Sequence, residues 1–444
     1  MSSKSTTGSK MRKSTCFALW TMGLFVWGFA SINRAWAAYP ETKLTASDGA
    51  ASDKFGFSVA ISGDYAIVGA QLDDDVIYDS GSAYVYHRNG TGWTQQEKLT
   101  ASDPREYGEF GHSVSISGDY AIVGAYHDDR GGYPAGAAYL FRRSGTNWTE
   151  MQKLPPPNDL TDYRHFGLSV SISGDYCIVG SWSNDAGENS GSAHIYHSDG
   201  TSWTRTNKLT ASDPGKWHYF GRSVSIDGDY AIVGASSNTN AACNPGGSAY
   251  IYERNAGGAD NWGQVAKLTG SDVTSGNRFG SSVSINGDYA IAGADWHNNS
   301  CGAAYVFERD PSGWTEIGKL TASDGAQDDW FGASVSVDNN FAAVGAYGDD
   351  DAGACSGSVY VFCRNESGWT QVSKLTGSDT ESNDLFGYSV SLSGTSAIVG
   401  AYEDYWQFSP GAAYVYDNVP EPATLSLLAI GGLVIIRRRK NRYN

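Results

Sequence analysis

Residues 110–125 read FGHSVSISGDYAIVGA, and close copies of this stretch recur six more times along the chain. The other copies begin at Phe55, Phe166, Phe220, Phe279, Phe331 and Phe386, so successive copies lie 52 to 59 residues apart. Self-similarity at a nearly fixed spacing is the sequence sign of a repeat architecture. We therefore interpret the chain as seven repeats of one structural unit.

Each repeat predicts four β-strands. SVSIS alternates small polar and apolar side chains, as a half-buried strand does. A Gly-Asp pair such as Gly118-Asp119 then predicts a hairpin turn into AIVGA, because Gly reaches positive φ and Asp bonds its own backbone. A third strand follows at Ala83–Tyr86 in the first copy, and a fourth runs from Trp93 to Leu99. Four strands and no helical stretch in about 50 residues are typical of one propeller blade.

The partial repeats predict how the ring closes. The Trp that opens the fourth strand occurs in six repeats, and the seventh repeat stops after its third strand at Tyr416. The Lys-Leu pair that ends the fourth strand nevertheless occurs seven times, and the extra copy, Lys43-Leu44, precedes the first repeat. An N-terminal strand that completes the last blade leaves no open edge. We predict an all-β, seven-bladed β-propeller of four-stranded antiparallel blades, closed in this way.

The Phe-Gly and Gly-Ala landmarks that bracket each strand-turn-strand unit resemble the FG-GAP repeat of integrin α-subunit propellers. The repeats of bacterial relatives are more similar still, because they share the segments TASDGA, FG, SVSISGD and AIVGA. The resemblance covers Lys43 to Tyr416 and implies a propeller. It does not specify the ligand, because one fold hosts many functions.

Both ends of the chain carry targeting signals. Basic residues precede an apolar run from Cys16 to Ala30, and Ala35-Trp36-Ala37 offers a small-x-small cleavage site, so residues 1–37 are expected to be a secretory signal peptide. Residues 419–444 contain Pro420-Glu421-Pro422, a short apolar segment and a terminal basic cluster. This tail resembles a PEP-CTERM sorting signal. The resemblance implies an exosortase-type partner in a Gram-negative bacterium, transient membrane association and removal of the tail. It also implies delivery to the cell surface, outer membrane or extracellular matrix.

The predicted propeller, residues 38–418, is strongly acidic. The chain has 31 basic and 48 acidic residues, and the two terminal segments hold ten of the basic ones but only one acidic one, which leaves a net charge of −26 between them. Such a field repels nucleic acid and suits cations or basic partners, or serves solubility alone. Cys243, Cys301, Cys355 and Cys363 allow disulfides in an oxidising compartment, with no pairing fixed by the sequence.

The candidate ligand site is the face that carries the 2–3 and 4–1 loops, where aromatic residues stand beside carboxylates. Aromatic faces and carboxylates together suit a sugar, a peptide or a basic ligand. The alternative is that the aromatic residues pack against the next blade and the Asp residues cap turns. The candidate residues are Tyr126, Asp128, Asp129, Trp182, Trp296, Tyr347, Tyr402 and Trp406.

Calcium is a possible cofactor at two runs of carboxylates, because hard cations take several oxygen ligands. The runs are Asp73, Asp74 and Asp75 in the first repeat, and Asp349, Asp350 and Asp351 in the sixth. The calcium loop of integrin propellers belongs instead in the 1–2 turn, and it is absent from all seven turns of this sequence.

The chain has no GxSxG, HExxH or Walker motif. The leading hypothesis is a non-enzymatic surface or matrix propeller that binds a polysaccharide or a protein. One alternative is an extracellular hydrolase or lyase acting on polysaccharide, with two rim carboxylates as acid and base. The other is a purely structural matrix protein.

Overall fold

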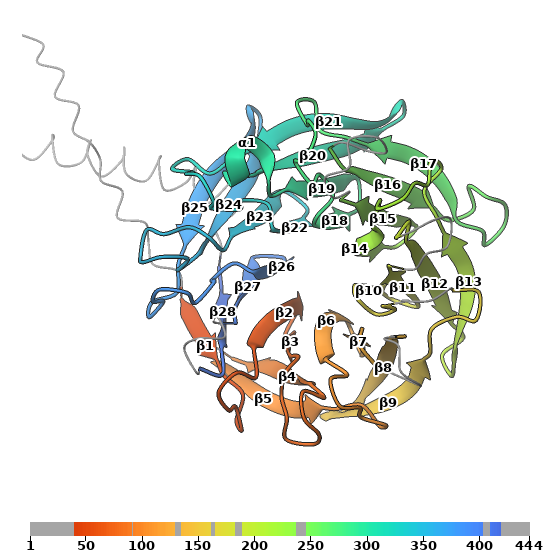
Figure 1. The fold of residues 1–444 in the computed structure, drawn as a ribbon, viewed down its shortest axis with the longest axis vertical. Coiled ribbons are helices and arrows are strands. Elements are labelled where there is room, and N and C mark those ends of the chain that lie inside the picture. The colour runs from red at the N-terminus through yellow and green to blue at the C-terminus, as the bar shows by residue number, and fades with distance from the viewer. Residues whose placement is uncertain are drawn as a thin grey trace, which may run out of the picture. The chain divides into compact units, whose positions relative to one another are not determined.

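The computed structural model describes residues 40–90, 92–128, 135–160, 165–182, 189–236, 246–402 and 409–418, all within the compact unit Ala38–Asn444. These residues form seven four-stranded antiparallel sheets, with one short helical turn, α1 (His297–Ser300). The seven sheets are blades set around a common axis (Figure 1). The predicted seven-bladed propeller is therefore confirmed.

Six blades have their strands in sequence order from the axis outwards, and in the last blade β26, β27 and β28 are followed by the N-terminal strand β1. The inner strands are β2 (Phe55–Ser62), β6 (Phe110–Ser117), β10 (Val170–Ser173), β14 (Phe220–Asp227), β18 (Val283–Asn286), β22 (Ser334–Asp338) and β26 (Ser389–Ser393). The second strands are β3 (Tyr65–Ala70), β7 (Tyr120–Ala125), β11 (Tyr176–Ser181), β15 (Tyr230–Ala235), β19 (Tyr289–Ala294), β23 (Phe341–Ala346) and β27 (Ser396–Ala401).

The third and outer strands complete the blades. The third strands are β4 (Ser82–Asn89), β8 (Ala137–Ser144), β12 (Ser192–Ser198), β16 (Ser248–Glu253), β20 (Ala303–Asp310), β24 (Ser358–Asn365) and β28 (Ala412–Tyr416). The outer strands are β5 (Gly92–Leu99), β9 (Asn147–Leu154), β13 (Trp203–Leu209), β17 (Gly263–Leu268), β21 (Gly313–Leu320), β25 (Gly368–Leu375) and, in the last blade, β1 (Glu41–Leu44).

The Phe-Gly and Gly-Ala landmarks form the contacts between neighbouring blades. Phe110 is fully buried and packs edge-on against Tyr139 of its own blade, with ring centroids 5.3 Å apart. Gly111, at a φ of 94°, brings its carbonyl so close to the preceding blade that a Cβ on Gly69 would lie 2.0 Å from that oxygen. The Ser58 hydroxyl donates to the same oxygen at 2.7 Å. Only glycine fits at Gly69 and Gly111, so the repeated landmarks are the seams of the ring.

The same seam occurs where the chain ends meet. β1 pairs antiparallel with β28, with Lys43 opposite Tyr414. The first and last repeats also touch, because the Ser389 hydroxyl donates to the Gly56 carbonyl at 3.0 Å, as Ser58 does to Gly111. The prediction that the N-terminal strand completes the last blade is confirmed.

Candidate functional site

A cavity of about 420 Å³ opens on the axis of the ring, at the end where the inner strands begin. All seven blades contribute to it through the residue that follows each Phe-Gly pair. Because the Phe side chain is buried in the blade and the Gly forms the seam, the next side chain reaches the axis. These seven residues are Phe57, His112, Leu168, Arg222, Ser281, Ala333 and Tyr388.

Two further repeat positions complete the wall of this axial cavity. The second strands end at the same face. The residue that directly follows the second strand lines the cavity in four blades, as Tyr126, Trp182, Asp295 and Tyr347, and His127 lies next to Tyr126 in the lining. The residue immediately before the Phe supplies His165 and Arg278. The cavity therefore lies on the predicted face, between the ends of the 4–1 loops and the starts of the 2–3 loops.

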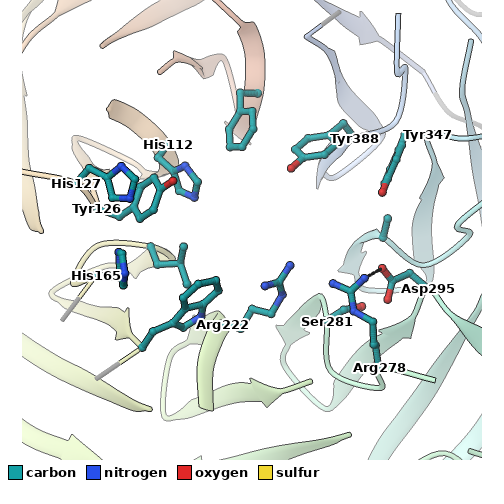
Figure 2. Close-up of a pocket in the computed structure, with 14 residues that line it drawn as sticks. His112, Tyr126, His127, His165, Arg222, Arg278, Ser281, Asp295, Tyr347 and Tyr388 are labelled. Atoms are coloured by element: carbon teal, nitrogen blue, oxygen red, sulfur yellow. Dashed lines mark ion pairs between the residues drawn. The ribbon is translucent and has the colours of Figure 1, made fainter. Parts of the chain in front are cut away.

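The walls of the axial cavity differ in chemistry (Figure 2). Three imidazoles and Tyr126 lie on one side, whereas Arg278, Asp295 and Tyr347 lie on the opposite side and Arg222 extends between them. Arg278 forms an ion pair with Asp295 at 3.1 Å. His127 contacts the Glu109 carboxylate at 3.0 Å, and Arg222 lies over the Trp182 ring at 5.7 Å.

Burial sets the protonation states of this cavity. It lowers the pKa of His112 to about 3 and that of His165 to about 4, with nearby His127 adding to both shifts. Both imidazoles are therefore neutral at pH 7. Burial also raises the pKa of the Tyr126 and Tyr347 phenols, which stay protonated. At neutral pH the guanidinium of Arg222 is then a positive charge beside an ion pair and neutral polar rings.

The structure places the aromatic candidates in three groups. Tyr126, Trp182 and Tyr347 line the axial cavity. Tyr402 lies beside it, with its ring 5.2 Å from that of Phe57. Trp296 is 41% exposed and holds the Arg278 guanidinium 4.9 Å from its ring centroid. Asp129 and Trp406 lie outside the described residues.

The carboxylate candidates take part in a contact that recurs in several blades. Asp128 is buried, accepts a hydrogen bond from the Tyr139 hydroxyl at 2.7 Å and forms an ion pair with Lys153. This lysine belongs to the Lys-Leu pair that ends the outer strand. The Asp128 carboxylate thus ties together the third strand, the outer strand and the 2–3 loop of its own blade.

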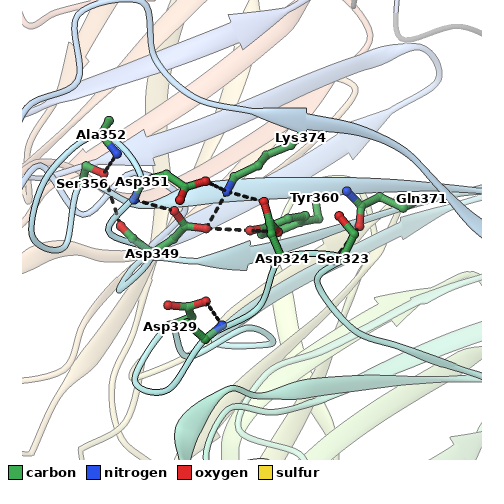
Figure 3. A network of polar contacts seen from close by, with 11 residues as sticks. Ser323, Asp324, Asp329, Asp349, Asp351, Ala352, Ser356, Tyr360, Gln371 and Lys374 are labelled. Carbon is green, nitrogen blue, oxygen red and sulfur yellow. Dashed lines mark hydrogen bonds and ion pairs between the residues drawn. The ribbon is translucent and has the colours of Figure 1, made fainter. Parts of the chain in front are cut away.

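The two Asp runs proposed for calcium are arranged in the same way (Figure 3). Lys374 Nζ lies 2.8 Å from Asp349 and 2.5 Å from Asp351, and Tyr360 donates to Asp349 at 2.6 Å. In the first blade Lys98 Nζ lies 3.0 Å from Asp73 and 2.6 Å from Asp75.

The remaining residues of the two runs, Asp74 and Asp350, are exposed. Within the described part of the chain, no three His, Cys, Asp or Glu side chains are grouped as a metal site would require. In each run a lysine ammonium therefore already pairs with two of the three carboxylates.

The FG-GAP repeat family matches the chain seven times, at residues 40–86, 93–141, 148–196, 203–252, 262–307, 314–362 and 369–416. The chain belongs to the FG-GAP repeat family. The first match begins one residue before β1, and each of the other six begins at the Trp that opens an outer strand.

A PEP-CTERM protein-sorting motif matches residues 418–440, after the FG-GAP propeller, and marks the protein for export to the cell envelope or surface and for processing by exosortase-type machinery. The described residues do not include the sorting-motif residues Pro420, Glu421 and Pro422 or the predicted cleavage residues Ala35 and Ala37. The described segments contain no helix with the length and hydropathy needed to cross a bilayer.

Solved structures similar to the FG-GAP propeller share little sequence with it. A functionally unknown protein from Desulfotomaculum acetoxidans is 13% identical with a TM-score of 0.47, and the match covers 76% of this chain and 89% of that one. Sqt1 of Saccharomyces cerevisiae is 11% identical with a TM-score of 0.44, covering 80% and 81%. The periplasmic gluconolactonase PpgL of Pseudomonas aeruginosa is 13% identical with a TM-score of 0.45, covering 73% and 86%. No curated protein sequence matches the chain.

Among the described cysteines of the FG-GAP propeller, Cys177, Cys301 and Cys363 are free thiols. Cys177 and Cys363 are buried, and Cys301 and Cys355 are half-buried. Cys243 lies outside the described residues.

Two arginines and two histidines of the axial cavity were not predicted as site residues. Arg222, Arg278, His112 and His165 adjoin Phe-Gly pairs, inside what reads as the repeat motif itself. Once the seven copies are aligned, the positions on either side of Phe-Gly vary widely between repeats, while Phe and Gly do not. That contrast within an inner strand is the signal that would have identified them.

Proposed function

We propose that this exported FG-GAP propeller is a non-enzymatic binding protein of the cell surface or extracellular matrix, and that it binds polysaccharide in its axial cavity. The observation that carries the proposal is the gathering of Trp182, Tyr126, Tyr347 and Tyr388 around a polar cavity to which every blade contributes. Flat aromatic faces supply contact area to sugar rings, and a few placed polar groups orient them.

The lining of the cavity favours binding over hydrolysis. Glycosidases use two carboxyl groups that flank the scissile bond. Asp295 is the one carboxyl residue among the described side chains that line the cavity, and it is engaged with Arg278 at 3.1 Å. A protein ligand at the same face is the alternative that binding measurements have to separate from a sugar.

The test is a glycan array probed with the propeller, followed by product analysis on every sugar that binds. We expect binding without new reducing ends or unsaturated products. Product formation would replace the proposal with a hydrolase or lyase. An array without any bound sugar would reject polysaccharide as the ligand and leave a protein partner or a structural role.

A further inference from the structure

Among the described residues, Arg222 forms no ion pair, unlike the other arginines that are buried or half-buried. Arg88, Arg143, Arg254, Arg278, Arg309 and Arg364 each form an ion pair with a carboxylate. Arg222 is half-buried in the axial cavity, and no carboxylate of the described residues lies within ion-pair distance of it. A partly desolvated charge without a counter-charge costs free energy that a bound anion would recover.

The groups around Arg222 favour an anion carried on a ring. Its guanidinium lies over the Trp182 indole. Burial lowers the pKa of Arg222, and the positive charge of nearby Arg278 lowers it further. A guanidinium beside the face of an indole offers an anion its counter-charge and offers a ring a flat apolar surface.

The charge of the site opposes the charge of the chain. The whole chain carries a formal charge of −17, which repels anions at long range. Among the described residues that line the axial cavity there are nevertheless two guanidinium groups and one carboxylate. A site for a cation or a neutral sugar would not need this local reversal.

We propose that the axial cavity binds a carboxylate-bearing sugar, such as a uronic acid residue of an acidic polysaccharide, with the carboxylate on Arg222 and the sugar ring against Trp182. This inference rests on the proposed polysaccharide-binding function. A guanidinium binds a carboxylate through two parallel hydrogen bonds, and such charge-assisted bonds are about twice as strong as neutral ones. The aromatic walls distinguish a sugar acid from a free inorganic anion.

The experiment is calorimetric titration of the full propeller with tetragalacturonate and with its methyl ester, which keeps the rings and removes the charge. We expect the acid to bind about 10- to 100-fold more tightly than the ester, and Arg222→Gln to lose the same factor for the acid only.

Arg142→Gln is the matched control. Arg142 is exposed on β8 over Tyr120, has no carboxylate partner among the described residues, and is not part of the cavity lining. It should change the affinity less than about 2-fold, since an exposed charge this far away is screened.

The other outcomes separate the two proposals. Equal affinity for the acid and the ester overturns the sugar-acid inference but keeps polysaccharide binding. Unchanged acid binding in an Arg222→Gln variant that melts like the wild type has the same two consequences. Full competition by inorganic sulfate at equal concentration also overturns it, because the ring would then contribute nothing. If the propeller binds neither probe and no sugar of the array, both proposals fail.

Discussion

Lys43 and Asp379, 336 residues apart, form an ion pair with 2.7 Å between Nζ and Oδ2. The same pairing of a Lys-Leu lysine with the Asp of a 4–1 loop joins Lys98 to Asp48 in the first blade. The Tyr414 hydroxyl donates to Asp379 as the Tyr84 hydroxyl donates to Asp48. β1 therefore takes the place of an outer strand in its contacts as well as in its pairing.

Leu44→Ala should destabilise the propeller as much as the equivalent change inside an ordinary blade. Leu44 and Leu99 are each 3% exposed at the end of their outer strands. Truncating a buried leucine costs about 2–5 kcal/mol. Urea unfolding should show similar shifts of the midpoint for Leu44→Ala and Leu99→Ala. A negligible shift for Leu44→Ala alone would mean that β1 does not close the ring.

Asp53→Asn should stabilise the propeller at pH 8 and not at pH 4. Asp53 is buried and accepts a hydrogen bond from the Ala50 amide, and burial raises its pKa from 3.8 to about 6. The unfolded chain loses this proton first, so the aspartate costs stability above about pH 6 and nothing below 3.8. The gain at pH 8 is about 1–3 kcal/mol.

The fifth blade provides the control for this prediction. Asn277 occupies the equivalent position and accepts the same hydrogen bond, from the Thr274 amide at 2.7 Å. Asn277→Asp should therefore destabilise the propeller at pH 8 and less at pH 4. Thermal melts at the two pH values measure both variants, and a pH-independent effect of either would contradict the assignment.

His112→Gln should make the propeller less sensitive to acid. The His112 imidazole contacts Gln71 Oε1 at 2.6 Å, and burial lowers its pKa from 6.5 to about 3. Between these values the unfolded chain binds a proton that the folded chain does not, so stability is full above pH 6.5 and falls as the pH drops towards 3. Melting temperatures from pH 7 to 4 should decline less steeply in the variant. Parallel curves would mean that His112 is not the group responsible.

A chelator should leave the melting temperature unchanged, because Lys98 and Lys374 already neutralise the two Asp runs. Differential scanning fluorimetry with EDTA and with calcium measures this. A rise in the melting temperature on adding calcium, abolished by Asp349→Asn, would contradict this prediction and support a calcium site at Asp349–Asp351.

Trp182→Ala should weaken tetragalacturonate binding at least about 10-fold, since it removes the largest stacking surface of the axial cavity. Trp296→Ala should weaken binding much less, because Trp296 is not among the lining residues and its ring packs against Arg278. Calorimetry measures the affinity of both variants for tetragalacturonate. Equal losses of affinity would place the binding site on the 2–3 loops, outside the axial cavity.

The sequence predicted the ring because its seams are made by glycines, and glycines such as Gly69 and Gly111 have no substitute where two backbones meet. It also placed Tyr126, Trp182 and Tyr347 together on one face, where they line the axial cavity, because topology alone assigns the loops to faces. It did not show that Asp128 is paired, because Lys153 lies 25 residues away on another strand. Arg222 was missed because only the three-dimensional ring brings the residue after each Phe-Gly to one axis.

The location of a bound sugar tests the central claim most directly. A crystal structure of the propeller with tetragalacturonate should show a carboxylate within hydrogen-bond distance of the Arg222 guanidinium and a sugar ring against Trp182, inside the axial cavity. Sugar density on the outer loops or the sides of the blades, with the cavity empty, would contradict it.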